Sequence, residues 1–389
     1  MRSNPGGQLA PADVLGRDKL IERLWRVLEG RSVILSAERR MGKTCLVKKM
    51  TAELPKEKLA VYHDLEQVHT TLEFAELLFR DVEEYLGTFH RSAEKVRQFL
   101  SHLEGAEVGK IIKFPKAVSP HWKTLITKTV EDLTSNRERS FVFFWDEVPL
   151  MLYKIKENEG ERAAMELLDL LRSVRQMHLD LRMIFTGSIG LHNVISSLKR
   201  AGYANDPTND MDLIEVPPLL PSDAKELASR LVRGEKLSVS NLDSICQAIA
   251  TEVDCIPYFI HHVVDQLTEL NQVIDFDVVR TVVHDCIADE NDRWHLQYYR
   301  ERIDVYYEPE EKALALALLD GVAASQEPLS FEKLFNTIKA SVVTEDRETT
   351  LGVLTHLRRD HYIAMDLQGR YNFRFPLIKR FWRLHRGLP

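Results

Sequence analysis

Residues 37–44 constrain this chain more than any other segment. They read Ala-Glu-Arg-Arg-Met-Gly-Lys-Thr and nearly match the pattern G-x-x-x-x-G-K-[ST]. The apolar run at 32–36 before them is typical of a short buried strand, and a helix is expected to begin at Thr44. A strand, a tight loop and a helix in this order bring backbone N–H groups to a helix N-terminus, where they can bind phosphate.

Each position of this loop has a chemical role in binding Mg·ATP. Gly42 lets the backbone approach closely, Lys43 neutralises the β- and γ-phosphate oxygens, and the Thr44 hydroxyl ligates Mg²⁺. Ala37 stands where the pattern has its first glycine; it is strained if that position needs a positive φ and tolerated if a small residue suffices. The other candidate nucleotide-binding residues of the segment are Glu38, Arg39, Arg40, Met41 and Cys45.

An acidic pair follows the most apolar stretch of the chain. Residues 141–145 read Phe-Val-Phe-Phe-Trp, which predicts a buried strand, and Asp146 and Glu147 come directly after it. The carboxyl ends of parallel strands meet at one edge of a sheet, beside the phosphates. We therefore expect Asp146 to hold Mg²⁺ and Glu147 to act as the general base on the attacking water.

A third polar group ends the next predicted strand, residues 181–185. Thr186, or as a second choice Ser188, could hydrogen-bond the γ-phosphate or its water. The same residues could equally form a plain turn. Both interpretations remain open from the sequence.

The predicted strands indicate the fold class. Apolar runs at 32–36, 59–63, 141–145, 181–185 and 211–216 alternate with amphipathic helical patterns. Continuous apolar strands separated by helices favour an α/β fold with a parallel sheet covered on both faces. The sequence therefore predicts a P-loop NTPase sheet.

Composition limits the setting of the protein. The chain has 389 residues, 44% of them hydrophobic and 29% charged, with a net charge of -7. This excludes a polycation, so any binding to nucleic acid needs a local basic surface. The four cysteines form no C-x-x-C pair, and no apolar run could span a bilayer. We expect a cytoplasmic protein without a membrane partner.

Changes in composition and residue pattern along the chain predict four regions. Residues 1–12 are small, polar and rich in Gly and Pro, which indicates a flexible leader. Residues 13–221 hold the nucleotide motifs, and 222–300 form a helical region that begins after Pro221. Residues 301–389 contain three short predicted helices and then two strands around Gln368-Gly369, the order of a winged helix.

The C-terminal region is basic. After residue 350 the only acidic residues are Asp360 and Asp366, and the basic residues are Arg358, Arg359, Arg370, Arg374, Lys379, Arg380, Arg383 and Arg386, with His residues besides. One interpretation is a winged helix that contacts the phosphate backbone of duplex DNA. The other is a domain that packs against acidic surface elsewhere in the protein or on a partner.

These motifs, in this order, resemble the AAA+/STAND group of additional-strand P-loop ATPases. The likeness is greatest to archaeal-type ATPases and to Orc/Cdc6-like replication initiators. It covers nearly the whole chain from residue 13, although only the two phosphate motifs are sharp. The segments that carry the resemblance are Leu15-Gly16-Arg17-Asp18, Arg39-Arg40-Met41-Gly42-Lys43-Thr44, Phe144-Trp145-Asp146-Glu147, Phe185-Thr186-Gly187-Ser188, Pro218-Leu219-Leu220, Ile256-Pro257-Tyr258-Phe259 and Tyr371-Asn372-Phe373-Arg374-Phe375.

The resemblance implies further features. The strand order would be 5-1-4-3-2, residues 222–300 would be a lid, and Leu15, Arg17 and Pro257 would flank the adenine. Arg200, after the fourth strand, would be the best-placed arginine finger, acting on a neighbouring subunit; its alternative is a solvated helix end. No arginine stands beside Pro257 to act as a sensor, which departs from the family pattern.

We therefore expect an ATP-hydrolysing molecular switch. Nucleotide would control its assembly, and it would act on DNA or a partner protein. One alternative is a winged-helix DNA-binding regulator. The other is a scaffold that holds an effector, which could belong to a defence system or a mobile element. In both alternatives ATP would be mainly a structural ligand. A homo-oligomer, duplex DNA and a protein effector all remain open as partners.

Overall fold

The computed structural model describes residues 1–389 except 89–92, 102–115, 136–139, 188–189, 340–345 and 389. The chain divides into two compact units. The core unit comprises residues 19–36 and 43–216, and the C-terminal unit comprises residues 1–18, 37–42 and 217–389. The segment 37–42 thus packs with the C-terminal unit although it lies between two elements of the core unit.

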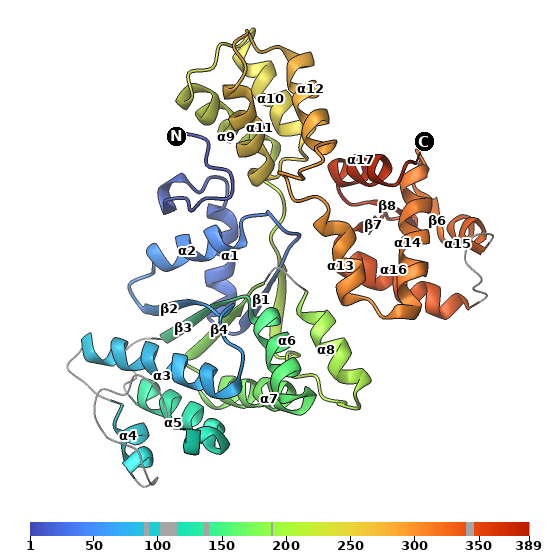
Figure 1. Cartoon of the computed structure of the whole chain (residues 1–389). Helices are drawn as coiled ribbons and strands as arrows, with labels where there is room; N and C mark the ends of the chain where they lie inside the picture. Colours follow the sequence, from blue (N-terminus) through green and yellow to red (C-terminus); the bar gives the residue numbers. More distant parts are fainter. Residues whose placement is uncertain (89–92, 102–115, 136–139, 188–189, 340–345, 389) are drawn as a thin grey trace. The chain divides into compact units, whose positions relative to one another are not determined.

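A five-stranded parallel sheet forms the centre of the core unit (Figure 1). Its order is β2-β3-β4-β1-β5, which confirms the predicted order 5-1-4-3-2. The strands are β1 (Ser32–Ser36), β2 (Lys58–Asp64), β3 (Ser140–Asp146), β4 (Leu181–Phe185) and β5 (Met211–Glu215). Because β4 pairs in parallel with both β3 and β1, the carboxyl ends of these three strands are neighbours at one edge of the sheet.

Helices cover both faces of this sheet. Phe141, Phe143 and Trp145 of β3 join one apolar cluster with side chains of the helices α3, α5, α6, α7 and α8. On the opposite face Phe144 makes an edge contact with Trp25 of α1. The helices of the unit are α1 (Asp18–Leu28), α2 (Lys43–Ala52), α3 (Thr71–Thr88), α4 (Glu94–Ser101), α5 (Trp122–Thr134), α6 (Val148–Glu159), α7 (Glu161–Met177) and α8 (Leu191–Arg200). Burial on two faces explains why β3 is apolar without alternation.

The C-terminal unit begins with helices, as the sequence predicts for 222–300. These are α9 (Pro221–Gly234), α10 (Leu242–Glu252), α11 (Pro257–Thr268), α12 (Phe276–Ile287) and α13 (Tyr298–Tyr306). Asn241 caps α10 and Asp275 caps α12, each with a side-chain oxygen on a backbone N–H of the first turn. An isolated bridge joins Val239 to Ile274 between helices.

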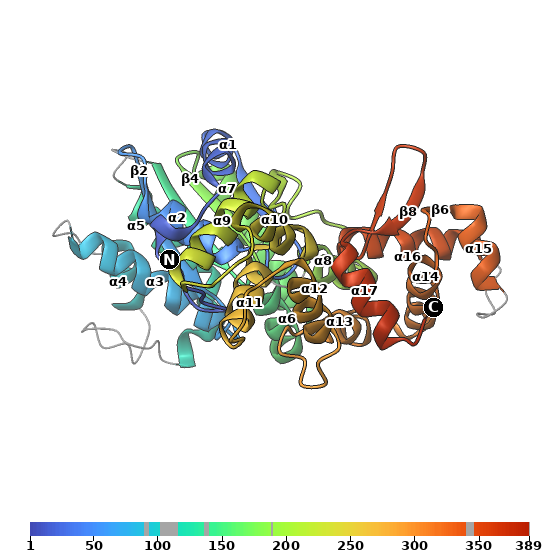
Figure 2. The same cartoon turned by 90° about the horizontal axis from the view of Figure 1, so that it is seen from above.

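The last part of the chain has a second, antiparallel sheet of order β6-β8-β7. Its elements are α14 (Pro309–Ala324), β6 (Leu329–Ser330), α15 (Phe331–Lys339), α16 (Arg347–Arg359), β7 (Ile363–Met365), β8 (Arg370–Phe373) and α17 (Pro376–His385). The three predicted helices and the hairpin are present, and Figure 2 shows the hairpin extending from the helices beside it. Neither β6 nor α17 is among the elements expected from the sequence.

The first residues of the chain contact helices of their own unit. Ser3 donates hydrogen bonds to Glu235 and Asp265, and the Asn4 backbone N–H donates to Nδ1 of His261. Burial lowers the pKa of His261 to about 4, so its ring stays neutral and can accept this bond. The flexibility of residues 1–12 remains a prediction. Among the described residues, no helix has both the length and the apolar composition that crossing a bilayer requires.

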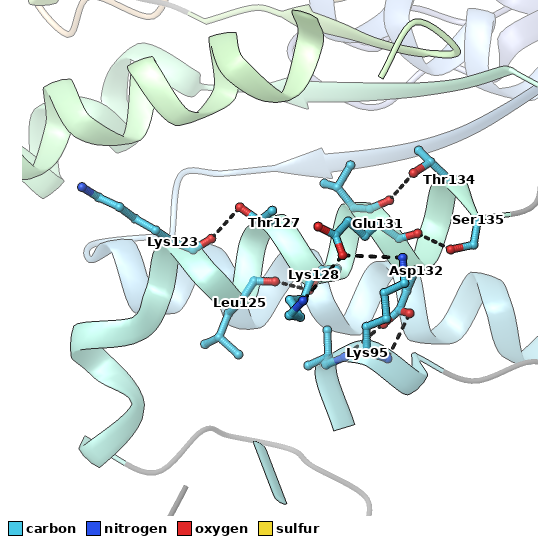
Figure 3. Close-up of polar contacts among 12 residues, drawn as sticks. Lys95, Lys123, Leu125, Thr127, Lys128, Glu131, Asp132, Thr134 and Ser135 are labelled. Carbon is cyan, nitrogen blue, oxygen red and sulfur yellow. Dashed lines mark hydrogen bonds and ion pairs between the residues drawn. The ribbon is translucent and has the colours of Figure 1, made fainter. Parts of the chain in front are cut away.

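Between β2 and β3 the helix α4 depends on a side chain of another helix. The carboxylate of Asp132 on α5 accepts hydrogen bonds from the backbone N–H groups of Lys95 and Val96, at 3.1 Å each (Figure 3). It thereby satisfies two of the N–H groups that a helix leaves unpaired at its start. Beside it, Lys95 and Lys128 form exposed ion pairs with Glu131.

We expect the Asp132→Ala variant to lose about 1 kcal/mol of stability, because it leaves the first N–H groups of α4 without their acceptor. Hydrogen exchange at the amides of Lys95 and Val96 should accelerate, and this is the measurement to make. Glu131→Ala is the matched control: it removes only exposed ion pairs and should change stability by less than about 0.5 kcal/mol. Equal effects of the two substitutions would contradict the assignment.

Candidate nucleotide site

A hydrogen bond joins two sequence motifs that lie 102 residues apart. Thr44, in the first turn of α2, donates its hydroxyl proton to Oδ2 of Asp146 at 2.7 Å. Asp146 is the last residue of β3 and is only 3% exposed. The structure therefore brings together the two side chains that the sequence predicts as Mg²⁺ ligands.

Tyr62 on β2 is a neighbour that the sequence motifs do not indicate. Its phenol contacts Oδ2 of Asp146 at 3.5 Å. Burial, and after it the charge of Asp146, raises the pKa of Tyr62, so the phenol keeps its proton and can donate it. The pairing of the strands explains the contact. Tyr62 on β2 pairs with Phe144 on β3, two residues before Asp146 at the end of that strand.

Glu147 has an unusual backbone conformation. Its φ is 57°, in the left-handed region, and it forms the N-cap of α6. Its backbone N–H donates to Oδ1 of Asp146 at 3.1 Å, so the carboxylate of Asp146 also fixes this turn. A non-glycine residue held in this region stores strain, which is common at functional sites. This geometry aims the Glu147 side chain differently from a continuing strand.

Gly187 lies against this turn. A Cβ on Gly187 would lie 2.6 Å from Cδ of Pro149 and 3.5 Å from Oε2 of Glu147. The backbone also joins the two strand ends, since Thr186 N–H donates to Trp145 C=O and Val148 N–H donates to Thr186 C=O. The ends of β3 and β4 therefore pack too closely for any side chain at position 187.

The Thr186 hydroxyl is a buried polar group that needs a partner. Thr186 is 2% exposed, and its Oγ1 has no hydrogen-bond partner within the described part of the chain. Buried hydroxyls are usually hydrogen-bonded, so an exception indicates a role or a ligand. Ser188, the second choice, lies outside the described residues.

The segment 37–42 is fixed within the C-terminal unit, and we call it the phosphate loop. Arg17 is 3% exposed and donates to the carbonyls of Met41 and Pro217, at 2.8 Å each. The guanidinium groups of Arg39 and Arg40 lie over the rings of Tyr298 and Tyr258 respectively, each 4.1 Å from the ring centroid.

Backbone angles settle the question of Ala37. Ala37 is not among the residues with positive φ, so alanine is unstrained there. Positive φ instead occurs at Gly42, at 84°, and at Arg40, at 73°. Glycine adopts this conformation at position 42 without the steric cost that a side chain bears there. Lys43 follows it as a buried residue at the start of α2, and Cys45 is half-buried.

Three more predicted site residues are described within their own units. Arg200 is exposed at the last residue of α8. In the C-terminal unit, Leu15 and Pro257 are half-buried, and Pro257 begins α11. Their roles remain predictions.

The residues present fit Mg·ATP. Oxygen ligands converge at Thr44 and Asp146, and the buried Thr186 hydroxyl supplies a further polar atom. The described residues contain no cluster of three or more His, Cys, Asp or Glu that could hold a metal ion.

Comparison with known proteins bears on the fold of the chain. No family model matches the sequence, and a search of curated proteins also finds no match. Among solved structures, the chain is similar to the Walker-type ATPase Paby2304 of Pyrococcus abyssi, with 16% identity and a TM-score of 0.65, covering 98% of this chain and 100% of that one. It is also similar to the Aeropyrum pernix ORC2 protein in its ADPNP–ADP complexes, with 12% identity and a TM-score of 0.52, covering 98% and 95%.

These likenesses support the fold, an α/β fold with the five-stranded parallel sheet of order 5-1-4-3-2 that P-loop NTPases have. The predicted resemblance to archaeal-type ATPases and Orc/Cdc6-like proteins is confirmed at this level. At such low identity they do not carry over the activity of either neighbour.

We expect Gly187→Ala to destabilise the core unit by about 1–3 kcal/mol, because the ring of Pro149 cannot move away from the added methyl group without shifting the turn. Chemical unfolding followed by Trp fluorescence measures the loss. Gly30→Ala serves as the control, since a Cβ there meets nothing within 4 Å. If both variants unfold alike, close packing at Gly187 is not what the structure indicates.

Proposed function

We propose that this chain is an ATP-binding and ATP-hydrolysing molecular switch of the AAA+/STAND type. The observation that carries the proposal is the 2.7 Å contact of the Thr44 hydroxyl with Asp146, at the N-terminus of α2 and the carboxyl end of β3. A hydroxyl and a carboxylate in contact at a helix start fit a cation bound to phosphate.

The proposed roles follow the chemistry of each group. Backbone N–H groups of 37–44 and the Lys43 ammonium would bind the phosphates. Thr44 and Asp146 would hold Mg²⁺, and the ion would supply positive charge beside the phosphate oxygens. Glu147 accepts a proton from the attacking water. The Thr186 hydroxyl, buried without a partner in the described chain, donates to the γ-phosphate or its water.

The remaining site residues have separate proposed roles. Leu15 and Pro257 would flank the adenine. Arg17 was predicted there too, but its guanidinium donates to the backbone of Met41, so we assign it to holding the phosphate loop. Arg200 at the exposed end of α8 is proposed as an arginine finger for a neighbouring copy of the chain, which would make hydrolysis depend on assembly.

We propose residues 13–221 as the ATPase domain, 222–300 as the lid and 301–389 as a winged helix. The order α14, β6, α15, α16, β7, β8 supports the last assignment. The γ-phosphate would favour one of two arrangements of lid and winged helix, and hydrolysis would release it. Free cysteines at all four positions support a cytosolic setting.

We expect Glu147→Gln to bind ATP and to lower kcat about a hundredfold or more, because it removes the general base and keeps the site's shape. Lys43→Ala should instead weaken ATP binding. Phosphate release and equilibrium binding of ATP separate the two effects. The matched control is Glu157→Gln. Glu157 is an exposed residue of α6, the helix that Glu147 caps, and this variant should hydrolyse ATP at the normal rate. Undiminished turnover by Glu147→Gln would remove the base assignment.

Duplex DNA is the client that we propose first. Several basic residues of the C-terminal region form ion pairs within the protein. Arg370 pairs with Asp366, Arg380 with Glu252 and Arg386 with Asp320. Arg358 and Arg359 differ, since both are exposed at the end of α16. In a winged helix the corresponding third helix is the one that enters the DNA groove.

We expect the ATPase rate or DNA retention to rise with duplex DNA and to fall steeply with salt. The double variant Arg358→Ala/Arg359→Ala should reduce the slope of log K against log salt by about 2, one for each phosphate that an arginine no longer neutralises. Arg280→Ala, which removes an exposed arginine from α12, should leave the slope unchanged. DNA-independent, salt-insensitive turnover would favour the alternative, a protein effector held by a nucleotide-dependent scaffold.

A further inference from the structure

A buried cluster of charges connects the phosphate loop to the end of α16. Nη1 of Arg302 lies 2.9 Å from Oε1 of Glu38, and its Nη2 lies 3.4 Å from Oδ1 of Asp360. The three side chains are 5%, 1% and 2% exposed. They come from α13, the phosphate loop and the C-cap of α16, all within the C-terminal unit.

Further groups hold this cluster. The hydroxyl of Tyr307 donates to Oδ2 of Asp360 at 2.9 Å, and Arg302 also lies over the ring of Tyr362. Burial alone would lower the pKa of Arg302, but Glu38, Tyr362 and Asp360 raise it well above its ordinary value. The guanidinium therefore stays charged between two carboxylates.

Glu38 is an unexpected residue for an anion-binding loop. A carboxylate that faced the phosphates would repel them, since the loop must concentrate positive charge there. The ion pair with Arg302 directs this carboxylate into the protein and neutralises it. The same oxygen, Oε1, accepts the backbone N–H of Arg39 at 2.7 Å, so the contact also fixes the orientation of a loop peptide.

The neighbouring loop side chains have partners on nearby parts of the unit. Arg39 lies over Tyr298, in the same helix as Arg302, and Arg40 lies over Tyr258 on α11. A movement of α13 would thus displace two consecutive residues of the loop, Glu38 and Arg39. Breaking a buried charge pair is costly because it leaves the other charge uncompensated, so these parts should move together.

We propose that Arg302 is a positioning residue for the phosphate loop. It neutralises Glu38 and links nucleotide binding at the loop to the conformation of residues 347–385 through Asp360. This inference rests on the proposed function, because it assumes that the loop binds a nucleoside triphosphate. Linkage is reciprocal, so a ligand of the C-terminal helices should change nucleotide affinity by the same factor as nucleotide changes theirs.

Hydrogen exchange without nucleotide tests the positioning role alone. Arg302→Met should accelerate exchange by at least about fivefold at the amides of 38–42 and of 357–362 together. Arg302→Lys keeps the charge but cannot contact both carboxylates, and it should restore only part of the protection. Asp304→Asn, which breaks an exposed ion pair with Arg300 on the same helix, is the matched control and should change neither segment. Unchanged exchange at 38–42 in a folded Arg302→Met would overturn the proposal.

A second variant covers the case in which Arg302→Met does not fold. Glu38→Gln/Arg302→Met/Asp360→Asn removes all three charges at similar volume, which buried ionic clusters often tolerate. With ATPγS, the wild type should gain protection at 357–362; the folded triple variant should still bind ATPγS, with Kd changed about fivefold or more, and gain none. The same nucleotide-dependent protection in both proteins would refute the linkage.

The two proposals fail in different ways. A wild type that binds no ATPγS by calorimetry contradicts the proposed function and, with it, the linkage to nucleotide. The exchange result for Arg302→Met still decides whether Arg302 positions the loop. Binding of ATPγS with no difference between wild type and triple variant contradicts the inference alone.

Discussion

The contact between Thr44 and Asp146 depends on the order of the strands. β1 and β3 do not pair with each other; both pair with β4, in parallel, so their carboxyl ends reach the same edge. The chain then starts α2 after β1 and turns sharply after β3, which puts a hydroxyl 2.7 Å from a carboxylate. With another strand order these residues, 102 positions apart, would lie at different places along the sheet edge.

Irregular backbone occurs both at this edge and in the phosphate loop. Glu147 and Arg40 have positive φ without being glycine, and Gly187 is closed to any side chain by Pro149. Such conformations persist only where surrounding contacts determine them. Here the contacts are identifiable: Asp146 accepts the N–H of Glu147, and Tyr258 carries the guanidinium of Arg40. Rigid support for awkward local geometry is what a site needs when positioning and electrostatics carry its chemistry.

Local patterns predicted the three central strands well because these strands are largely buried. The runs 32–36 and 181–185 match β1 and β4 residue for residue, and 141–145 differs from β3 by one residue at each end. The helix α17 was not predicted, although Leu377, Ile378 and Phe381 have helical spacing and are buried. The hydroxyl of Thr44 and the carboxylate of Asp146 could be paired in advance, since motif spacing and strand ends are both local signals.

Long-range charge pairing could not be predicted in the same way. Glu38 and Arg302 are 264 residues apart, and neither has a sequence neighbour that indicates the other. Counting charges also overstated the basic surface after residue 350, because Arg380 and Arg386 pair with acids of earlier helices.

A charge in a sequence does not show whether it faces water, a ligand or another charge; only the fold decides this. That decision has chemical consequences at the phosphate loop. There Arg302 pairs with the buried carboxylate of Glu38, so this acid does not oppose the anion binding that we propose for the loop.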